Sequence, residues 1–222
     1  MSHILTLMTF IPLGGALIIL CLPRDKHKLV KIVAAITTAI PLLLAVLLYL
    51  NFDRSTHEFQ FVEHYKWIEA FNIEYFMGVD GLSAIMILLT ALLCFICIFA
   101  SWGIDKGVKG YFSLFLLLDT GMVGVFTALD FFLFYIFWEV MLLPMYFLIG
   151  IWGGPRKEYA AIKFFLYTLL GSVLMLLAML YLYFTNDHTF DMTKLMAAGP
   201  AAGMDIRAIL VWLAFFVAFA IK

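Results

Sequence analysis

The feature that most constrains the fold of this chain is a succession of long apolar segments separated by mostly short connections. We identify seven, at residues 4–22, 29–50, 82–102, 110–129, 131–152, 160–184 and 206–222. Most are long enough to cross the roughly 30 Å hydrocarbon core of a bilayer as helices. Because backbone groups in lipid must pair within their own segment, each is expected to be helical. The sequence therefore predicts an all-α polytopic membrane protein with about seven transmembrane helices.

The composition excludes a single water-soluble domain. Hydrophobic residues make up 65% of the chain and charged residues 13%, whereas soluble domains carry about 25% charged residues. The net charge of −1 argues against nucleic-acid binding, which requires a basic surface. The N-terminus lacks a charged region and a small-residue cleavage site, so we interpret the first apolar segment as a retained helix.

Two connections are longer than the others, at residues 51–81 and 185–205. The first mixes aromatic and acidic residues and predicts either a hairpin or a helix lying on the membrane surface. Asp80, in GVDGLS, is placed to cap the third helix. Cys94 and Cys97 have the C-x-x-C spacing of redox and metal sites, but we interpret them as small apolar residues on one helix face. No histidine has ligand spacing, so no metal site is predicted.

The placement of Lys and Arg predicts the orientation of the chain. One set of connections carries Arg24, Lys26, Lys28, Lys31, Lys106, Lys109, Arg156, Lys157 and Lys163. The other set carries only Arg54, Lys66, Lys194 and Arg207. The excess of positive charge predicts that the first, third and fifth connections are cytoplasmic and that the N-terminus lies outside.

Ionisable residues within the apolar segments are the candidates for function. They are Asp119, Glu139, Lys163 and Lys222, on the fourth to seventh segments. A charge at the centre of a bilayer costs roughly 3 kcal/mol on insertion scales, which makes a purely structural purpose expensive. Pro144, five residues after Glu139, predicts a helix kink beside this acid.

Consecutive helices usually lie close together, so these four residues are expected to share an interior. Glu139, Lys222 and Lys163 are expected to form a proton relay, with Asp119 as a candidate member. The alternative for Glu139 and the lysines is a static buried ion pair. Asp119 has the alternative of a hydrogen bond to Thr120, and Lys163 that of reaching the membrane surface. Asp130, between the fourth and fifth segments, is a further candidate whose alternative is helix capping.

Several motifs resemble one known family in the same order along the chain. ALDFFLFYIFWEVMLLPMYFLIGIWGG at residues 128–154 resembles the fifth-helix signature of the subunit M, or chain 4, family of respiratory complex I. GVDGLS (78–83), GMVGVF (121–126), AAIKFFLYTLLGS (160–172) and FFVAFAIK (215–222) resemble its other patterns. The L and N subunits and the Mrp-type antiporters share the general plan, but their fifth helices differ more.

The resemblance implies a role for each candidate residue. Glu139 matches the essential glutamate of the fifth helix, and Lys222 matches its lysine partner at the break of a discontinuous seventh helix. Lys163 matches the lysine that tunes this pair, and Asp130 a polar position at the mouth of the fifth helix. No required acid of the family corresponds to Asp119.

The resemblance also implies the architecture. Family members have fourteen helices with two inverted repeats, a common device of transporters. Residues 1–109 would then form three N-terminal helices with the external loop 51–81. Residues 110–222 would begin the first antiporter-like repeat and stop within its seventh-helix segment. We therefore expect this chain to be the N-terminal fragment of a longer protein.

The function implied is proton translocation in the membrane arm of NADH–quinone oxidoreductase, driven by electron transfer from NADH to quinone in other subunits. This chain would hold no cofactor or redox centre, and FMN, iron–sulfur clusters and quinone would belong to partner subunits. L-type and N-type subunits would be its neighbours in a bacterial inner membrane. A multi-subunit cation/proton antiporter, a membrane-bound hydrogenase or formate-linked complex, and an inert structural subunit are the alternatives.

Overall fold

The computed structural model describes residues 3–23, 25–198 and 206–222. Arg24, which the count of positive charges includes, lies outside them, as do residues 199–205 of the second long connection. The α-helices in chain order are α1 (Ile4–Cys21), α2 (His27–Leu50), α3 (Gly81–Ala100), α4 (Val108–Thr127), α5 (Phe131–Val140), α6 (Leu142–Trp152), α7 (Lys157–Thr185), α8 (Met192–Ala198) and α9 (Ile206–Ile221).

The helical membrane fold predicted from the sequence is confirmed. Six of the seven predicted segments form spans long and apolar enough to cross a membrane, and α9 is a shorter apolar helix. The fifth segment is divided into α5 and α6. The short helix α8, in the second long connection, was not predicted.

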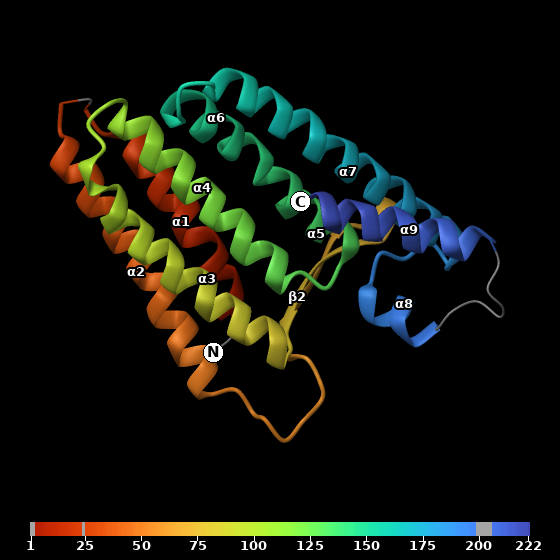
Figure 1. Cartoon of the computed structure of the whole chain (residues 1–222). Coiled ribbons are helices and arrows are strands. Elements are labelled where there is room, and N and C mark those ends of the chain that lie inside the picture. The colour runs from red at the N-terminus through yellow and green to blue at the C-terminus, as the bar shows by residue number, and fades with distance from the viewer. Residues whose placement is uncertain (1–2, 24, 199–205) are drawn as a thin grey trace.

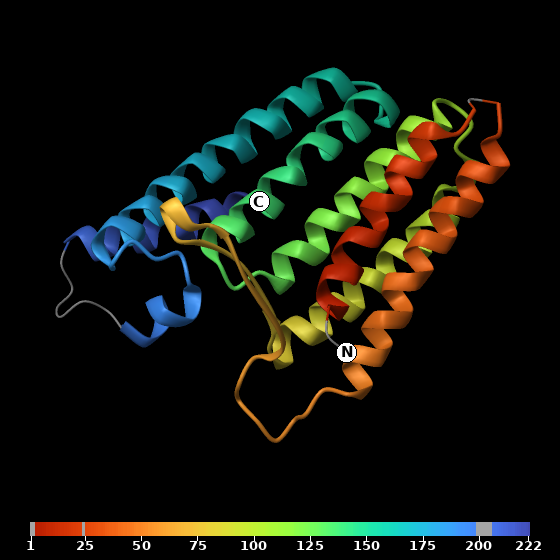
Figure 2. The same cartoon turned by 180° about the vertical axis from the view of Figure 1, so that it is seen from behind.

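Two groups of helices lie side by side (Figures 1 and 2). The helices α1, α2, α3 and α4 pack into one bundle, while α6 and α9 both pack on α7. The helix α4 also contacts α5 and α6, so it joins the two groups. The helix α4 therefore contacts helices on both sides of the domain boundary predicted at residue 109. This boundary stays a prediction.

The first long connection forms a hairpin, which is one of the two structures predicted for it. Strands β1 (Gln60–Ile68) and β2 (Ile73–Val79) pair antiparallel, with Tyr65 opposite Tyr75. The turn contains the 3-10 helix η1 (Glu69–Phe71) and then Asn72 at φ 49°. Asparagine tolerates this left-handed conformation better than most residues, which favours the tight reversal.

Strand β2 of the hairpin is hydrogen-bonded to a connection between helices, which is hydrogen-bonded in turn to a second connection. The N–H of Leu129, between α4 and α5, donates to the carbonyl oxygen of Phe76 at 2.8 Å. On the other side, the N–H of Met192 donates to the carbonyl oxygen of Leu129 at 2.9 Å, and that of Phe131 to Phe190 at 2.8 Å. Backbone from three distant parts of the sequence is thus satisfied in one place.

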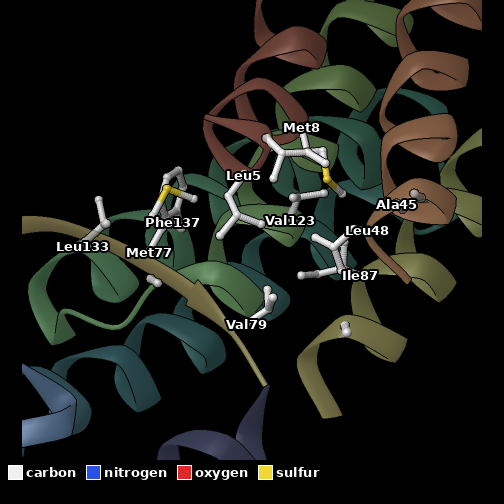
Figure 3. Packing of buried hydrophobic residues seen from close by; sticks show 14 residues of the cluster. Leu5, Met8, Ala45, Leu48, Met77, Val79, Ile87, Val123, Leu133 and Phe137 are labelled. Atoms are coloured by element: carbon white, nitrogen blue, oxygen red, sulfur yellow. The ribbon is translucent and has the colours of Figure 1, made fainter. Parts of the chain in front are cut away.

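The largest buried apolar cluster lies where the hairpin meets the first bundle, and Figure 3 shows its members. Leu5 and Met8 of α1, Met77 and Val79 of β2 and Val123 of α4 are all completely buried. The hairpin is therefore part of the core that joins α1 to α4, and not a loose external loop.

Lysines at the opposite end of the bundle bind the carboxyl ends of helices. The Nζ of Lys31 donates to the carbonyl oxygen of Trp102 at 2.6 Å, and that of Lys109 to Leu22 at 2.8 Å. The last carbonyls of a helix lack intrahelical partners and carry partial negative charge, so an ammonium group stabilises them. These lysines are among those used to predict the orientation of the chain. They also bind the carboxyl ends of α1 and of the 3-10 turn after α3.

The amino end of α1 depends on a carboxylate from the hairpin. Its own N-cap, His3, makes no side-chain cap. Instead, the buried Glu63 of β1 accepts a hydrogen bond from the N–H of Leu5 at 2.8 Å and one from that of Thr6 at 3.3 Å. The Thr6 hydroxyl donates to the same carboxylate. A negative charge here also interacts favourably with the helix dipole.

Replacing Glu63 with Ala is therefore expected to destabilise the protein by roughly 1–3 kcal/mol, because two N–H groups lose their acceptor. The measurement is the thermal unfolding midpoint of the detergent-solubilised protein, followed by circular dichroism. Glu58→Ala is the control, since Glu58 is exposed on the same connection. Equal midpoints for the two variants would contradict the capping role.

Candidate functional site

The fifth apolar segment is interrupted next to its acid. The helix α5 ends at Val140 and α6 begins at Leu142, with Met141 between them. Pro144, in the first turn of α6, has no N–H to donate to the carbonyl of Val140, and its ring crowds that carbonyl. The interruption therefore falls within two residues of Glu139.

Two glycines of α4 let this helix approach the interruption closely. A Cβ atom on Gly124 would lie 2.3 Å from the ring of Phe137, and one on Gly121 would lie 2.5 Å from Cγ of Met141. Both distances are far below van der Waals contact. Glycine at these two positions is thus required for α4 to lie against α5 as it does.

The carboxyl group of Glu139 is poorly satisfied. Its Oε1 is buried and has no hydrogen-bond partner among the described residues. An uncompensated buried carboxylate is costly, so this group requires either a proton or a nearby positive charge. A candidate for that charge is Lys222, which interacts with Glu139 electrostatically.

Lys222 occupies a position beside α5 without forming an ion pair with Glu139. Its Nζ donates to the carbonyl oxygen of Trp138 and lies 4.1 Å from the centroid of the Trp138 ring. Among the described residues, the ion pairs within 4.0 Å do not include Glu139 with Lys222. The structure thus brings the predicted pair into one site with the two charges apart.

The position of Lys222 follows from the packing of α9 on α7 and α5. Ile221 lies so close to α7 that a Cβ on Gly171 would be 3.3 Å from its side chain. Phe215 of α9 stacks on Phe131 of α5 at 5.6 Å between centroids. Both overall views accordingly place the C-terminal end beside α5 and α6 (Figures 1 and 2).

Lys163 is not joined to this pair in the described structure. Its side chain is exposed, and its Nζ lies 5.9 Å from the centroid of the Tyr159 ring, also on α7. It lines an open cavity of about 580 Å³ together with Arg156 and Lys157. A role for Lys163 in the relay stays a prediction.

Asp130 is fully buried at the amino end of α5, where it caps the helix. Its carboxylate accepts hydrogen bonds from the N–H groups of Phe132 at 2.9 Å, Leu133 at 3.0 Å and Glu74 at 3.2 Å. Burial raises the pKa of Asp130 to about 6, against the opposing effect of these three donors. Through these hydrogen bonds, Asp130 connects strand β2 of the hairpin to α5, the helix that carries Glu139.

Asp119 lies inside the first bundle, away from this site. It is 1% exposed, and its Oδ1 has no hydrogen-bond partner among the described residues. The carboxyl group interacts with the thiol of Cys94 on α3. Thr120 donates its hydroxyl hydrogen bond to Leu116 and not to Asp119.

The C-x-x-C pair does not share one environment, because Cys94 is buried and Cys97 is exposed. Within the described ranges no three His, Cys, Asp or Glu side chains gather in a way that would hold a metal ion. Glu139 and Lys222 bring a carboxyl group and an ammonium group to the site, and such groups can gain, lose and share protons.

Comparison with known proteins identifies the class. Residues 128–222 match the model of the membrane domain described as NADH:quinone oxidoreductase/Mrp antiporter. The fold resembles a chain of the Mrp complex from Dietzia sp. DQ12-45-1b, with a TM-score of 0.81 over 98% of this chain and 23% of that one, at 20% identity. The fold is thus that of the antiporter-like membrane subunits.

The remaining comparisons narrow this class. Residues 5–127 match the model for the amino terminus of NADH-ubiquinone oxidoreductase chain 4. Subunit M of NADH-quinone oxidoreductase from Rickettsia typhi is 39% identical over 99% of this chain and 45% of its own length. Chain 4 from Arabidopsis thaliana is 40% identical over 95% of this chain and 42% of its own length.

A chain of respiratory complex I from Thermus thermophilus superposes with a TM-score of 0.82 at 29% identity, over 97% of this chain and 43% of that one. The chain belongs to the family of NADH-quinone oxidoreductase subunit M, also called chain 4. The resemblance inferred from the motifs is confirmed. The chain spans less than half the length of the relatives described above.

Two contributions to the site were missed by sequence reasoning. Trp138, which binds the ammonium group of Lys222, appeared only as one more aromatic residue of an apolar segment. Gly121 and Gly124 were noted within a family motif but not as the contact surface for α5. Their spacing of three residues, which places both on one face of a helix, was the signal that could have revealed it.

Gly124→Ala is expected to lower the free energy of unfolding by roughly 1–3 kcal/mol, because the added methyl group overlaps the ring of Phe137. This loss occurs although alanine is the better helix former by about 1 kcal/mol. Thermal unfolding in detergent measures it. Gly14→Ala is the matched control, since nothing lies within 4 Å of a Cβ at Gly14; similar behaviour of both variants would disprove the close contact.

Asp130 gives the stability of the protein a pH dependence of defined sign. Since burial raises its pKa from 3.8 to about 6, the folded state binds the proton more tightly than the unfolded state. The contribution of Asp130 to stability is therefore full below about pH 4, falls as the pH rises to about 6, and is constant above.

Asp130→Asn keeps an acceptor for the N–H groups but cannot titrate. The unfolding midpoints of the parent and of this variant are compared from pH 4 to 7. As the pH rises, the midpoint of the parent is expected to fall relative to that of the variant. Taking the difference removes the contributions of other carboxyl groups, such as Asp191, whose pKa is lowered by its hydrogen bonds despite opposing burial. A difference that is constant across this range would refute the raised pKa.

Proposed function

We propose that this chain is part of a membrane-arm subunit of a proton-translocating NADH–quinone oxidoreductase. The observation that carries the proposal is the electrostatic interaction between Glu139, at the interruption between α5 and α6, and Lys222, at the end of α9. Membership of the subunit M family supports it. In this proposal the protein is a translocase, which moves protons across the membrane.

The relay works through the dependence of each charge on the other. A carboxylate at Glu139 is stabilised by the nearby ammonium of Lys222, and this stabilisation weakens when the two separate. A change in their separation therefore changes the tendency of Glu139 to hold a proton. Lys163 is proposed to modulate the pair, and Asp130 to shape the mouth of α5. No role in transfer is assigned to Asp119.

Electron transfer from NADH to quinone takes place in partner subunits, which hold the FMN, the iron–sulfur clusters and the quinone site. We propose that L-type and N-type subunits are neighbours, that the membrane is the bacterial inner membrane, and that the N-terminus is periplasmic. The orientation rests on the excess of Lys and Arg in the first, third and fifth connections.

A multi-subunit cation/proton antiporter or a membrane-bound hydrogenase complex would use the same charges. The likeness to the Mrp complex is one of fold alone, at 20% identity. The relatives at 39% and 40% identity are both named as subunits of the NADH oxidoreductase, which favours the oxidoreductase.

Glu139→Gln in the full-length parent, within its complex, is expected to abolish or sharply reduce proton pumping while the complex still assembles. Glutamine has nearly the shape of glutamate but cannot carry the proton. The measurement is the number of protons moved per electron in proteoliposomes. Glu158→Gln is the control, since Glu158 is exposed near the start of α7. Normal stoichiometry in the Glu139 variant would overturn the proposed function.

A further inference from the structure

Lys222 has a binding place that does not involve Glu139. Its Nζ donates to the backbone carbonyl oxygen of Trp138 and lies 4.1 Å from the centroid of the indole. Tryptophan offers the strongest cation–π face of the natural side chains. One residue thus supplies both a hydrogen-bond acceptor and a ring face to the same ammonium group.

The interruption of the fifth segment makes this carbonyl available. Trp138 lies in the last turn of α5, which ends at Val140. The last four carbonyls of a helix have no partner in their own helix and bear partial negative charge. The ammonium of Lys222 therefore lies at the negative end of α5, where it donates to the carbonyl oxygen of Trp138.

The indole ring is held in place by packing. Phe134 stacks on it at 5.6 Å with 28° between the planes, and Phe219 of α9 meets it edge-on at 5.4 Å. Trp138 is 8% exposed, and its Nε1 has no hydrogen-bond partner among the described residues. The orientation of the ring thus comes from its aromatic neighbours, while its face contacts the cation.

We propose that Trp138 is a positioning residue, which holds the ammonium group of Lys222 while Glu139 is neutral. This inference rests on the proposed proton relay. When Glu139 is ionised, its carboxylate attracts the ammonium. When hydronium from the aqueous phase gives a proton to this carboxylate and becomes water, that attraction ends and the ammonium rests on Trp138. Lys222 keeps its own hydrogens in this step.

Trp138 and Glu139 are consecutive residues in the last turn of α5, so both partners of the ammonium belong to one helical turn. The arrangement gives the separated state a defined geometry and avoids leaving a bare charge in an apolar site. The structure, with the ammonium on Trp138 and no ion pair to Glu139, corresponds to the separated state.

The test compares substitutions that fill similar space with and without an aromatic face, in the full-length protein within its complex. Trp138→Phe retains a ring, whereas Trp138→Met and Trp138→Leu retain apolar volume alone. Proton pumping in proteoliposomes is expected to stay within a few-fold of the parent for Phe and to fall roughly tenfold for Met and Leu, because the cation–π contact is lost. Both ring-free variants are made, so that one of them gives the result if the other fails to assemble.

Phe132→Met is the matched control, because Phe132 is an aromatic residue of the same helix whose ring packs on Phe190 at 5.7 Å. If packing alone mattered, this control and Trp138→Met would be impaired alike, and Trp138→Phe would show no rescue; either result overturns the inference.

Glu139→Gln, measured in parallel, separates the two proposals. Loss of pumping in Glu139→Gln with normal pumping in Trp138→Met rejects only the role of Trp138. Normal pumping in Glu139→Gln rejects the relay itself.

Discussion

The close approach of α4 to α5 is the contact on which the site depends. Gly121 and Gly124 present bare backbone to Phe137 and Met141, the residues that flank Glu139. Apolar surface in lipid gains little from meeting other apolar surface, so membrane helices associate through tight contact between small residues. The uninterrupted helix α4 therefore packs against the interruption at Met141. This contact gives the Glu139 carboxyl group a defined position although its own helix is broken.

The parts of the fold that repeat a local pattern could be predicted from the sequence. Apolar length alone identified the seven segments, and Asp80 was correctly expected to cap α3, where its carboxylate accepts a hydrogen bond from the N–H of Ser83 at 2.7 Å. Glu139 was conspicuous because a charge in an apolar run is rare. These signals are readable because cause and effect lie within a few residues of each other.

What could not be predicted joins residues far apart in the chain. Glu63 was one of several acidic residues in the first long connection, yet it caps α1 from 57 and 58 residues away. Trp138 gave no sign that its carbonyl and ring would receive Lys222, which is 84 residues distant. Such contacts depend on how helices pack, and hydrophobic periodicity does not specify which faces meet.

Lys31 and Lys109 show how one side chain can serve two stages in the life of a membrane protein. In the proposed orientation, their charge would bias these ends of the helices to stay in the cytoplasm during insertion. In the finished fold, the same ammonium groups bind the carbonyls of Trp102 and Leu22. Moving such a lysine along the sequence would preserve the charge count yet leave a helix end without its donor. The positions of topogenic charges are thus restrained by hydrogen bonding as well as by their sum.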